Sequence, residues 1–145
     1  MAYKVSDIAH KIIKFTSDSA AGELVSNLKL QKLLYYQQGF HLAYFETPLF
    51  DEDIEAWMYG PVVPSIYETY KLAGSNGLIY DGNVISLQPK EEALFCEVMK
   101  VYGEFSAVGL MNMTHKEKPW KETGVGVGKV IDKEKMTIFF KKKLK

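Results

Sequence analysis

The spacing of apolar and polar positions predicts a mainly helical chain built around one central helix. Between residues 28 and 45, large apolar side chains recur at the i, i+3, i+4, i+7 spacing of one helix face. That face comprises Leu30, Leu33, Leu34, Gln37, Phe40, His41 and Tyr44, and the apolar surface extends to other faces through Tyr35, Tyr36 and Leu42. A helix that is apolar around most of its circumference packs against neighbours on several sides. We therefore expect this helix to be buried at the centre of the molecule.

Local signals mark the limits of this central helix. Ser26 and Asn27 precede it and supply side-chain oxygens for the unpaired amides of its first turn. Thr47-Pro48 ends it, because proline restricts the preceding residue to extended conformations. Gly39 lies inside the helix and costs roughly 1 kcal/mol relative to alanine. We therefore expect a neighbouring side chain to pack closely against Gly39.

The same spacing predicts helices on both sides of the central one. Ser6 is expected to cap the first helix, and a loop is expected after it at 17–22. The lysines of this helix are expected in solvent (Lys4, Lys11, Lys14), and its apolar residues are expected to face inward (Val5, Ile8, Ala9, Ile12, Ile13, Phe15). Further helices are expected from Pro64 to Gly74, from Pro89 to Gly103, after Ser106 and after Asp132. Their inward residues are Val63, Ile66, Tyr67 and Tyr70, then Leu94, Val98, Val101 and Tyr102, then Leu110, then Met136, Phe139 and Phe140. A capping box is expected at Thr114–Glu117.

Two short segments carry the alternation that is typical of strands. Ile54, Ala56 and Met58 alternate with Glu55, Trp57 and Tyr59 up to Gly60-Pro61. Residues 78–85 predict a hairpin, because Asp81-Gly82 suits the positive φ angles of a type I′ turn. The expected fold is thus mainly α with a small antiparallel β-hairpin, an α+β arrangement. We expect one compact domain over residues 1–145, a helical bundle around the buried helix at about 28–45.

Composition and charge narrow the class of protein. The chain has 145 residues, 47% of them hydrophobic, which is typical of a globular protein. We expect neither a secretion signal nor a membrane span, since no apolar run approaches ~18 residues. Cys96 is the single cysteine, which suits a reducing, cytoplasmic location. The 18 basic residues are all lysine and balance 18 acidic ones, although seven of the lysines lie between residues 129 and 145.

The titratable residues offer few catalytic arrangements. Cys96 with His41 or His115 would be a nucleophile and a base, but mid-helix cysteines are ordinarily buried and inert. His41 lies on the apolar face of the central helix, so we expect a hydrogen-bonded core residue. His115 is either a surface contact or pH-sensitive latch, or a structural hydrogen-bonding residue in the turn that ends at Trp120. These patterns favour a binding module over an enzyme.

Other polar segments have simpler interpretations. Residues 124–129 resemble a phosphate-binding loop, but Thr123 and Val130 occupy positions where that motif requires glycine and serine or threonine, so we expect a flexible connector. The acidic group of Asp51, Glu52, Asp53 and Glu55 lacks the spacing of a calcium loop and is expected to be solvated. The lysine-rich C-terminal helix favours solubility, with contact to nucleic acid or an acidic partner as the alternative.

Aromatic residues around a rigid turn form the strongest candidate for a binding surface. Trp57, Tyr59, Tyr67 and Tyr70 surround Gly60-Pro61-Val62-Val63-Pro64. Tyrosine and tryptophan are enriched at binding hot spots, because they combine a large apolar ring with a polar group. The alternative is that these rings complete the core. Composition and spacing do not decide between the two.

Several separated motifs resemble the Panacea domain, also called the SocA-like antitoxin family. These are Leu28 to Tyr36, Gly39 with His41-Leu42, Pro48-Leu49-Phe50, Ile54 to Trp57, Tyr59 to Pro64, Thr114 to Glu117, and Pro119-Trp120. They occur in the family's order and cover most of the chain. Carried over from the family motifs are Lys29, Gln31, Lys32, Tyr59, Gly60, Pro61, Val62, Pro64, His115 and Trp120.

The resemblance implies an antitoxin that neutralises a cognate toxin protein by direct binding, in a toxin–antitoxin system that is often prophage-associated. No cofactor is implied. The alternatives are an adaptor that delivers a partner to a AAA+ protease, or a DNA-binding regulatory protein. The absence of arginine and of net charge weighs against nucleic acid. Together, the motifs and the aromatic turn predict partner binding at the ten carried-over residues with Trp57 and Tyr67.

Overall fold

The computed structural model describes residues 2–18 and 24–144. Helices dominate: α1 (Val5–Asp18), α2 (Asn27–Phe45), α3 (Pro64–Tyr70), the 3-10 helix η1 (Lys71–Ala73), α4 (Pro89–Tyr102), α5 (Ala107–His115), α6 (Lys118–Thr123) and α7 (Lys133–Lys141). Strands β1 (Glu55–Trp57) and β2 (Gly60–Val62) form a two-stranded sheet. The mainly α fold with a small antiparallel hairpin is as predicted. Residues 19–22 of the predicted loop, and Lys145, lie outside the described residues.

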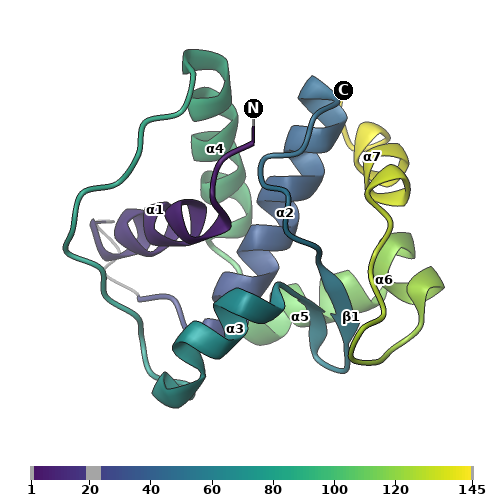
Figure 1. The fold of residues 1–145 in the computed structure, drawn as a ribbon, viewed down its shortest axis with the longest axis horizontal. Helices are drawn as coiled ribbons and strands as arrows, with labels where there is room; N and C mark the ends of the chain where they lie inside the picture. Colours follow the sequence, from purple (N-terminus) through teal and green to yellow (C-terminus); the bar gives the residue numbers. More distant parts are fainter. Residues whose placement is uncertain (1, 19–23, 145) are drawn as a thin grey trace.

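Helix α2 runs through the middle of the molecule (Figure 1). Helices α1 and α4 lie on one side of it, α6 and α7 lie on the other, and α3, α5 and the hairpin lie at its N-terminal end (Figure 1). Every residue from Leu30 to Ala43 is buried. The Ser26 hydroxyl accepts a hydrogen bond from the Lys29 amide, which confirms the predicted N-cap. The prediction of a central buried helix is therefore correct.

Gly39 is the point of closest approach between α2 and α7. A Cβ atom built on Gly39 would lie 2.2 Å from the Phe140 ring. Phe140 is itself fully buried and contacts Tyr35, Tyr36 and Phe40 ring to ring. The expected close neighbour of Gly39 is thus a ring from the last helix. Helix α7 begins where expected, because the Asp132 carboxylate accepts from the Glu134 amide.

The sheet lies in the first of the two predicted strand segments. Glu55 pairs with Val62 and Trp57 pairs with Gly60, so the residues after the predicted strand turn back as β2. Residues 126–131 cover the other side of β1: Ala56 donates to the Lys129 carbonyl at 2.9 Å and accepts from the Gly126 amide at 2.8 Å. The prediction of a flexible connector at 124–129 is therefore wrong. This connector is tied to β1 by backbone hydrogen bonds.

The predicted hairpin at 78–85 is absent. These residues form an extended loop in which Gly82 does not have the positive φ angle of a type I′ turn. Contacts with other segments hold the loop instead: Leu78 donates to the Val25 carbonyl at 2.7 Å, and the Tyr80 ring stacks on His10 of α1 at 4.0 Å. An isolated two-stranded hairpin is marginal in water. The tertiary contacts therefore override the local turn signal.

Three predictions about helix ends and faces are also wrong. Helix α1 begins before Ser6, so Ser6 is not its cap. Lys11 is buried, because its Nζ donates to the Ile85 carbonyl at 2.9 Å and pairs with Glu92 at 3.0 Å. Val101 of α4 is exposed, whereas Val98 and Tyr102 are buried as expected. In residues 2–18 and 24–144, no helix has both the length and the apolar character needed to cross a membrane.

The predicted capping box at Thr114–Glu117 does not form. Thr114 lies in the last turn of α5, where its hydroxyl donates to the Met111 carbonyl at 2.7 Å. A capping box occurs instead at the start of α4, between Gln88 and Glu91. Ser106 caps α5 as predicted, accepting from the Gly109 amide. His115 is therefore the last residue of α5 rather than the start of a new turn.

Candidate functional site

Two buried polar side chains of α2 hold the hairpin in place. The Lys32 Nζ donates to the Pro61 carbonyl at 2.9 Å, and the Gln31 amide oxygen accepts from the Val63 amide at 2.9 Å. Gln31 is itself oriented by Asn27, whose Oδ1 accepts from its side-chain nitrogen at 2.9 Å. These bonds satisfy backbone groups that would otherwise be buried without partners. The second strand is thus fixed to the central helix.

Gly60 allows the turn to approach α2 closely. Its φ angle is +108°, a conformation that L side chains rarely adopt, and a Cβ atom there would lie 2.6 Å from the Lys32 Cε. Burial lowers the pKa of the Lys32 amine to about 7, because the interior disfavours its charged form. Because the Gly60 backbone lies against the Lys32 side chain, these two motif residues form one packed unit.

Four of the residues that are predicted to bind a partner converge on the outer side of this unit. The rings of Trp57 and Tyr67 meet edge to face with centroids 5.2 Å apart. The Trp120 indole donates to the Trp57 carbonyl at 2.9 Å, and its ring stacks on His115 at 4.2 Å. The His115 Nε2 donates to the Met58 carbonyl at 3.1 Å. Residues from β1, α3, α5 and α6 thus form one aromatic cluster.

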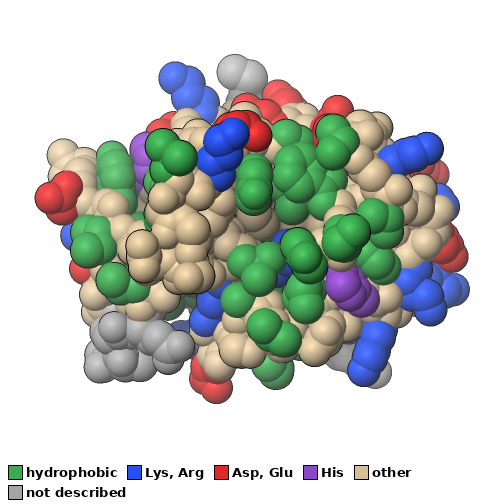
Figure 2. Space-filling view, turned by 90° about the horizontal axis from the view of Figure 1, so that it is seen from below, with side chains coloured by type: hydrophobic (Ala, Val, Ile, Leu, Met, Phe, Trp, Pro, Cys, Tyr) green, Lys and Arg blue, Asp and Glu red, His purple; other side chains and the backbone are tan. Residues whose placement is uncertain are grey.

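At the tip of the hairpin, Met58 and Tyr59 project into solvent, with 66% and 61% of their surface exposed. We call the surface formed by Trp57, Met58, Tyr59, Tyr67, His115 and Trp120 the hairpin face. Figure 2 views the molecule from the end where α3, α5 and β1 lie, and hydrophobic side chains gather across this end with a histidine among them. The hairpin face is therefore an apolar surface on a rigid support.

The other residues with a predicted role in binding have different positions. Gln31, Lys32, Gly60, Pro61 and Val62 are buried, so in this fold they support the hairpin face from beneath. Pro64 is half-buried at the first turn of α3. The Lys29 amine donates to the Gly103 carbonyl at 2.6 Å, at the end of α4. Tyr70, the remaining member of the predicted aromatic surface, packs against the core.

Glu117 supports the hairpin face from the core and was missed as a site residue. It is buried between α5 and α6, and its carboxylate accepts from the Tyr35 hydroxyl at 3.0 Å and from the Tyr36 hydroxyl at 2.8 Å. Burial raises the pKa of Glu117, although both hydrogen bonds oppose this rise. The sequence placed Glu117 only in a predicted capping box and at the end of a family motif, and neither signal indicated a buried carboxylate. Its tyrosine partners lie about eighty positions away in sequence.

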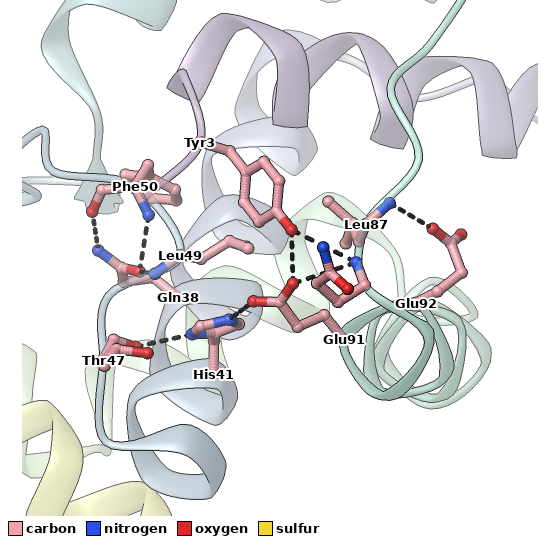
Figure 3. A network of polar contacts seen from close by, with 10 residues as sticks. Tyr3, Gln38, His41, Thr47, Leu49, Phe50, Leu87, Glu91 and Glu92 are labelled. Carbon is pink, nitrogen blue, oxygen red and sulfur yellow. Dashed lines mark hydrogen bonds and ion pairs between the residues drawn. The ribbon is translucent and has the colours of Figure 1, made fainter. Parts of the chain in front are cut away.

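A second polar network joins the N-terminal segment, α2 and α4 (Figure 3). His41 contacts the Thr47 carbonyl through Nδ1 and the Glu91 carboxylate through Nε2, each at 2.7 Å. The Tyr3 hydroxyl donates to the other Glu91 oxygen at 2.5 Å. Burial disfavours the Glu91 carboxylate, but the bonds from Tyr3 and His41 outweigh this effect and lower its pKa. His41 is a hydrogen-bonded core residue, as predicted.

This network leaves no free base on His41, since both ring nitrogens are engaged. Cys96 is half-buried on α4, less buried than expected. In the acidic group, Asp53 pairs with Lys133 at 3.2 Å, and Glu55 accepts from the Trp57 indole and the Gly128 amide, each at 2.8 Å. These side chains stabilise the chain around β1. Of the candidate sites, only the hairpin face combines aromatic side chains with an exposed tip, at Met58 and Tyr59.

Comparison with known proteins agrees with the motifs on this scaffold. The family model described as "Antitoxin SocA-like, Panacea domain" matches residues 30–121, which include most of α2, the hairpin and α5. The chain belongs to this family. A relative from Caulobacter vibrioides (strain NA1000 / CB15N), Antitoxin SocA, is 30% identical over 117 residues, or 72% of this chain. The chain spans 62% of the length of that relative. No solved structure matches the chain.

Proposed function

We propose that this protein is an antitoxin that neutralises a toxin protein by binding it directly through the hairpin face. The family and the relative named Antitoxin SocA support the antitoxin role. The observation that carries the choice of surface is the exposure of Met58 and Tyr59 on a turn fixed from beneath by Lys32 and Gln31. A rigid apolar projection loses little conformational entropy on binding. Neutralisation by binding requires no catalytic step.

The test is coexpression with the product of the adjacent gene, followed by recovery of both proteins on one affinity tag. Restored growth and a stoichiometric complex are expected. Toxin levels should be followed by immunoblot, because binding alone leaves the toxin intact whereas delivery to a protease depletes it. Toxicity without rescue and without copurification would reject the antitoxin function for this pair.

The Tyr59→Ala variant should weaken toxin binding about 10-fold or more, because exposed aromatic residues in a rigid patch are typical hot spots. Titration calorimetry on the purified complex measures this change. The matched control is Tyr44→Ala, since Tyr44 at the end of α2 is 58% exposed, close to the 61% of Tyr59. Equal affinities for the two variants would show that the toxin binds elsewhere.

A further inference from the structure

The sheet of the hairpin has no edge available for a partner strand. The outward-facing groups of Ala56 in β1 bond to Lys129 and Gly126. On β2, the Pro61 carbonyl accepts from Lys32, and the Val63 amide at the end of the strand donates to Gln31. Strand addition requires unpaired backbone groups along an edge. A partner must therefore contact this end of the molecule through side chains.

Helix α5 extends the hairpin face with an apolar stripe. Val108, Met111 and His115 lie at i, i+3 and i+7, the spacing of one helix face. Val108 is 55% exposed, Met111 is half-buried, and His115 joins the stripe to the hairpin tip through the Met58 carbonyl. From Ala107 to Asn112 the helix has no charged side chain. The stripe and the hairpin face thus share His115.

Lysines flank this surface at the corner between α5 and α6. Lys116, Lys118 and Lys121 are exposed, and none of them forms an ion pair with another described residue. The acid between them, Glu117, points inward to the tyrosines of α2. In contrast, the α7 lysines Lys133, Lys135 and Lys141 pair with Asp53, Glu122 and Glu46. No acidic side chain in residues 2–18 and 24–144 therefore neutralises the positive charge beside the apolar surface.

We propose that the hairpin face and the α5 stripe bind a toxin segment that presents apolar side chains flanked by acidic ones. The inference rests on the proposed antitoxin function and specifies the chemistry of its partner. The apolar side chains cover Val108 and Met58, and the carboxylates face Lys116, Lys118 and Lys121. Strand pairing contributes nothing to the complex.

The two components act on different rate constants, which makes the proposal testable. Charges at the rim of an interface mainly accelerate association, whereas buried apolar contacts mainly slow dissociation. With the product of the adjacent gene immobilised, the Lys116→Glu/Lys118→Glu/Lys121→Glu variant should associate about 10-fold more slowly. Its association should become faster with added salt, because salt screens the repulsion between the new carboxylates and those of the partner. The Val108→Asp variant should dissociate at least about 10-fold faster at an unchanged salt dependence.

Matched variants control for charge and for exposure. Lys4→Glu/Lys90→Glu/Lys100→Glu changes net charge equally, at exposed positions in the N-terminal segment and α4. Ile138→Asp matches Val108→Asp, because Ile138 on α7 is also 55% exposed. Both controls should bind like the unmodified chain. Circular dichroism should be used to check that all four variants are folded.

The remaining outcomes separate this inference from the antitoxin function. A complex that forms normally with the substituted α5–α6 variants overturns the inference and leaves the antitoxin function intact. Failure of the unmodified chain to bind or rescue overturns both. A homodimer through the hairpin face in sedimentation, or binding of a DNA duplex that is lost in the lysine variant, would assign the surface to another partner and also overturn the inference.

Discussion

The Gly39→Ala variant should have a free energy of unfolding about 2–3 kcal/mol below that of the unmodified chain. Alanine would ordinarily stabilise the middle of a helix by roughly 1 kcal/mol relative to glycine. Here its methyl group would lie 2.2 Å from the Phe140 ring, so α7 must move away from α2. Phe140 cannot yield easily, because the core rings of Tyr35, Tyr36 and Phe40 surround it. Urea denaturation followed by circular dichroism measures the change.

Gly109→Ala is the control, since it makes the same substitution in α5. A Cβ atom on Gly109 would lie 3.1 Å from the Ser106 hydroxyl, which needs only a small adjustment. This variant should change stability by no more than about 1 kcal/mol. Adding Phe140→Leu to Gly39→Ala should cost less than the sum of the two single changes, because the smaller side chain relieves the clash. A Gly39→Ala protein as stable as the control would contradict the close packing of α2 and α7.

The stability of the protein should rise on the order of 3 kcal/mol between about pH 7 and pH 10 through the titration of Lys32. Burial lowers the pKa of Lys32 to about 7 in the folded chain, whereas an unfolded lysine has a pKa of about 10.4. Between these values, the unfolded chain binds a proton that the folded chain lacks. Raising the pH through this window therefore favours the folded state. Urea midpoints at about pH 7, 8, 9 and 10 measure the slope.

Lys32→Met isolates this contribution, because methionine has a similar length and no titrating group. The variant leaves the Pro61 carbonyl without its donor, and the loss of this hydrogen bond costs about 1–2 kcal/mol independently of pH. Its stability should nevertheless lack the rise attributed to Lys32. Burial raises the pKa of Tyr35 and Tyr36 in both proteins, so the difference between them cancels the tyrosine contribution. Parallel curves for the two proteins would mean that Lys32 is charged in the folded state throughout.

The candidate site was predictable in composition but not in geometry. The aromatic spacing and the family motifs indicated Trp57, Tyr59, Tyr67, His115 and Trp120. The structure brings Trp57, Tyr67, His115 and Trp120 into one cluster and leaves Tyr59 exposed beside it, at the tip of the hairpin. The same motifs include Gln31 and Lys32, which support the cluster from the core. A family motif does not distinguish a residue that contacts a partner from a residue that holds the binding surface in place. Glu117 shows the limit most clearly, because its two tyrosine partners lie on α2, about eighty positions earlier in the sequence.

Features that depend on neighbours within one or two helical turns were predictable from the sequence. The central buried helix and the caps at Ser26, Ser106 and Asp132 follow from apolar spacing and local hydrogen bonding, and the structure has all of them. The family motifs likewise led to the Panacea family, to which the chain belongs.

The pairing of segments that lie far apart in the sequence became clear only from the three-dimensional structure. The turn that Asp81-Gly82 predicts does not form, because residues 78–80 contact Val25 and α1 instead. The sheet forms at residues 55–62, where α2 covers one edge and the 126–131 segment covers the other. Lys11, expected in solvent, is buried because Ile85 and Glu92 supply its partners from 74 and 81 positions away. Burial and long-range hydrogen bonding depend on the packing of all the helices together, and that information is absent from any local pattern.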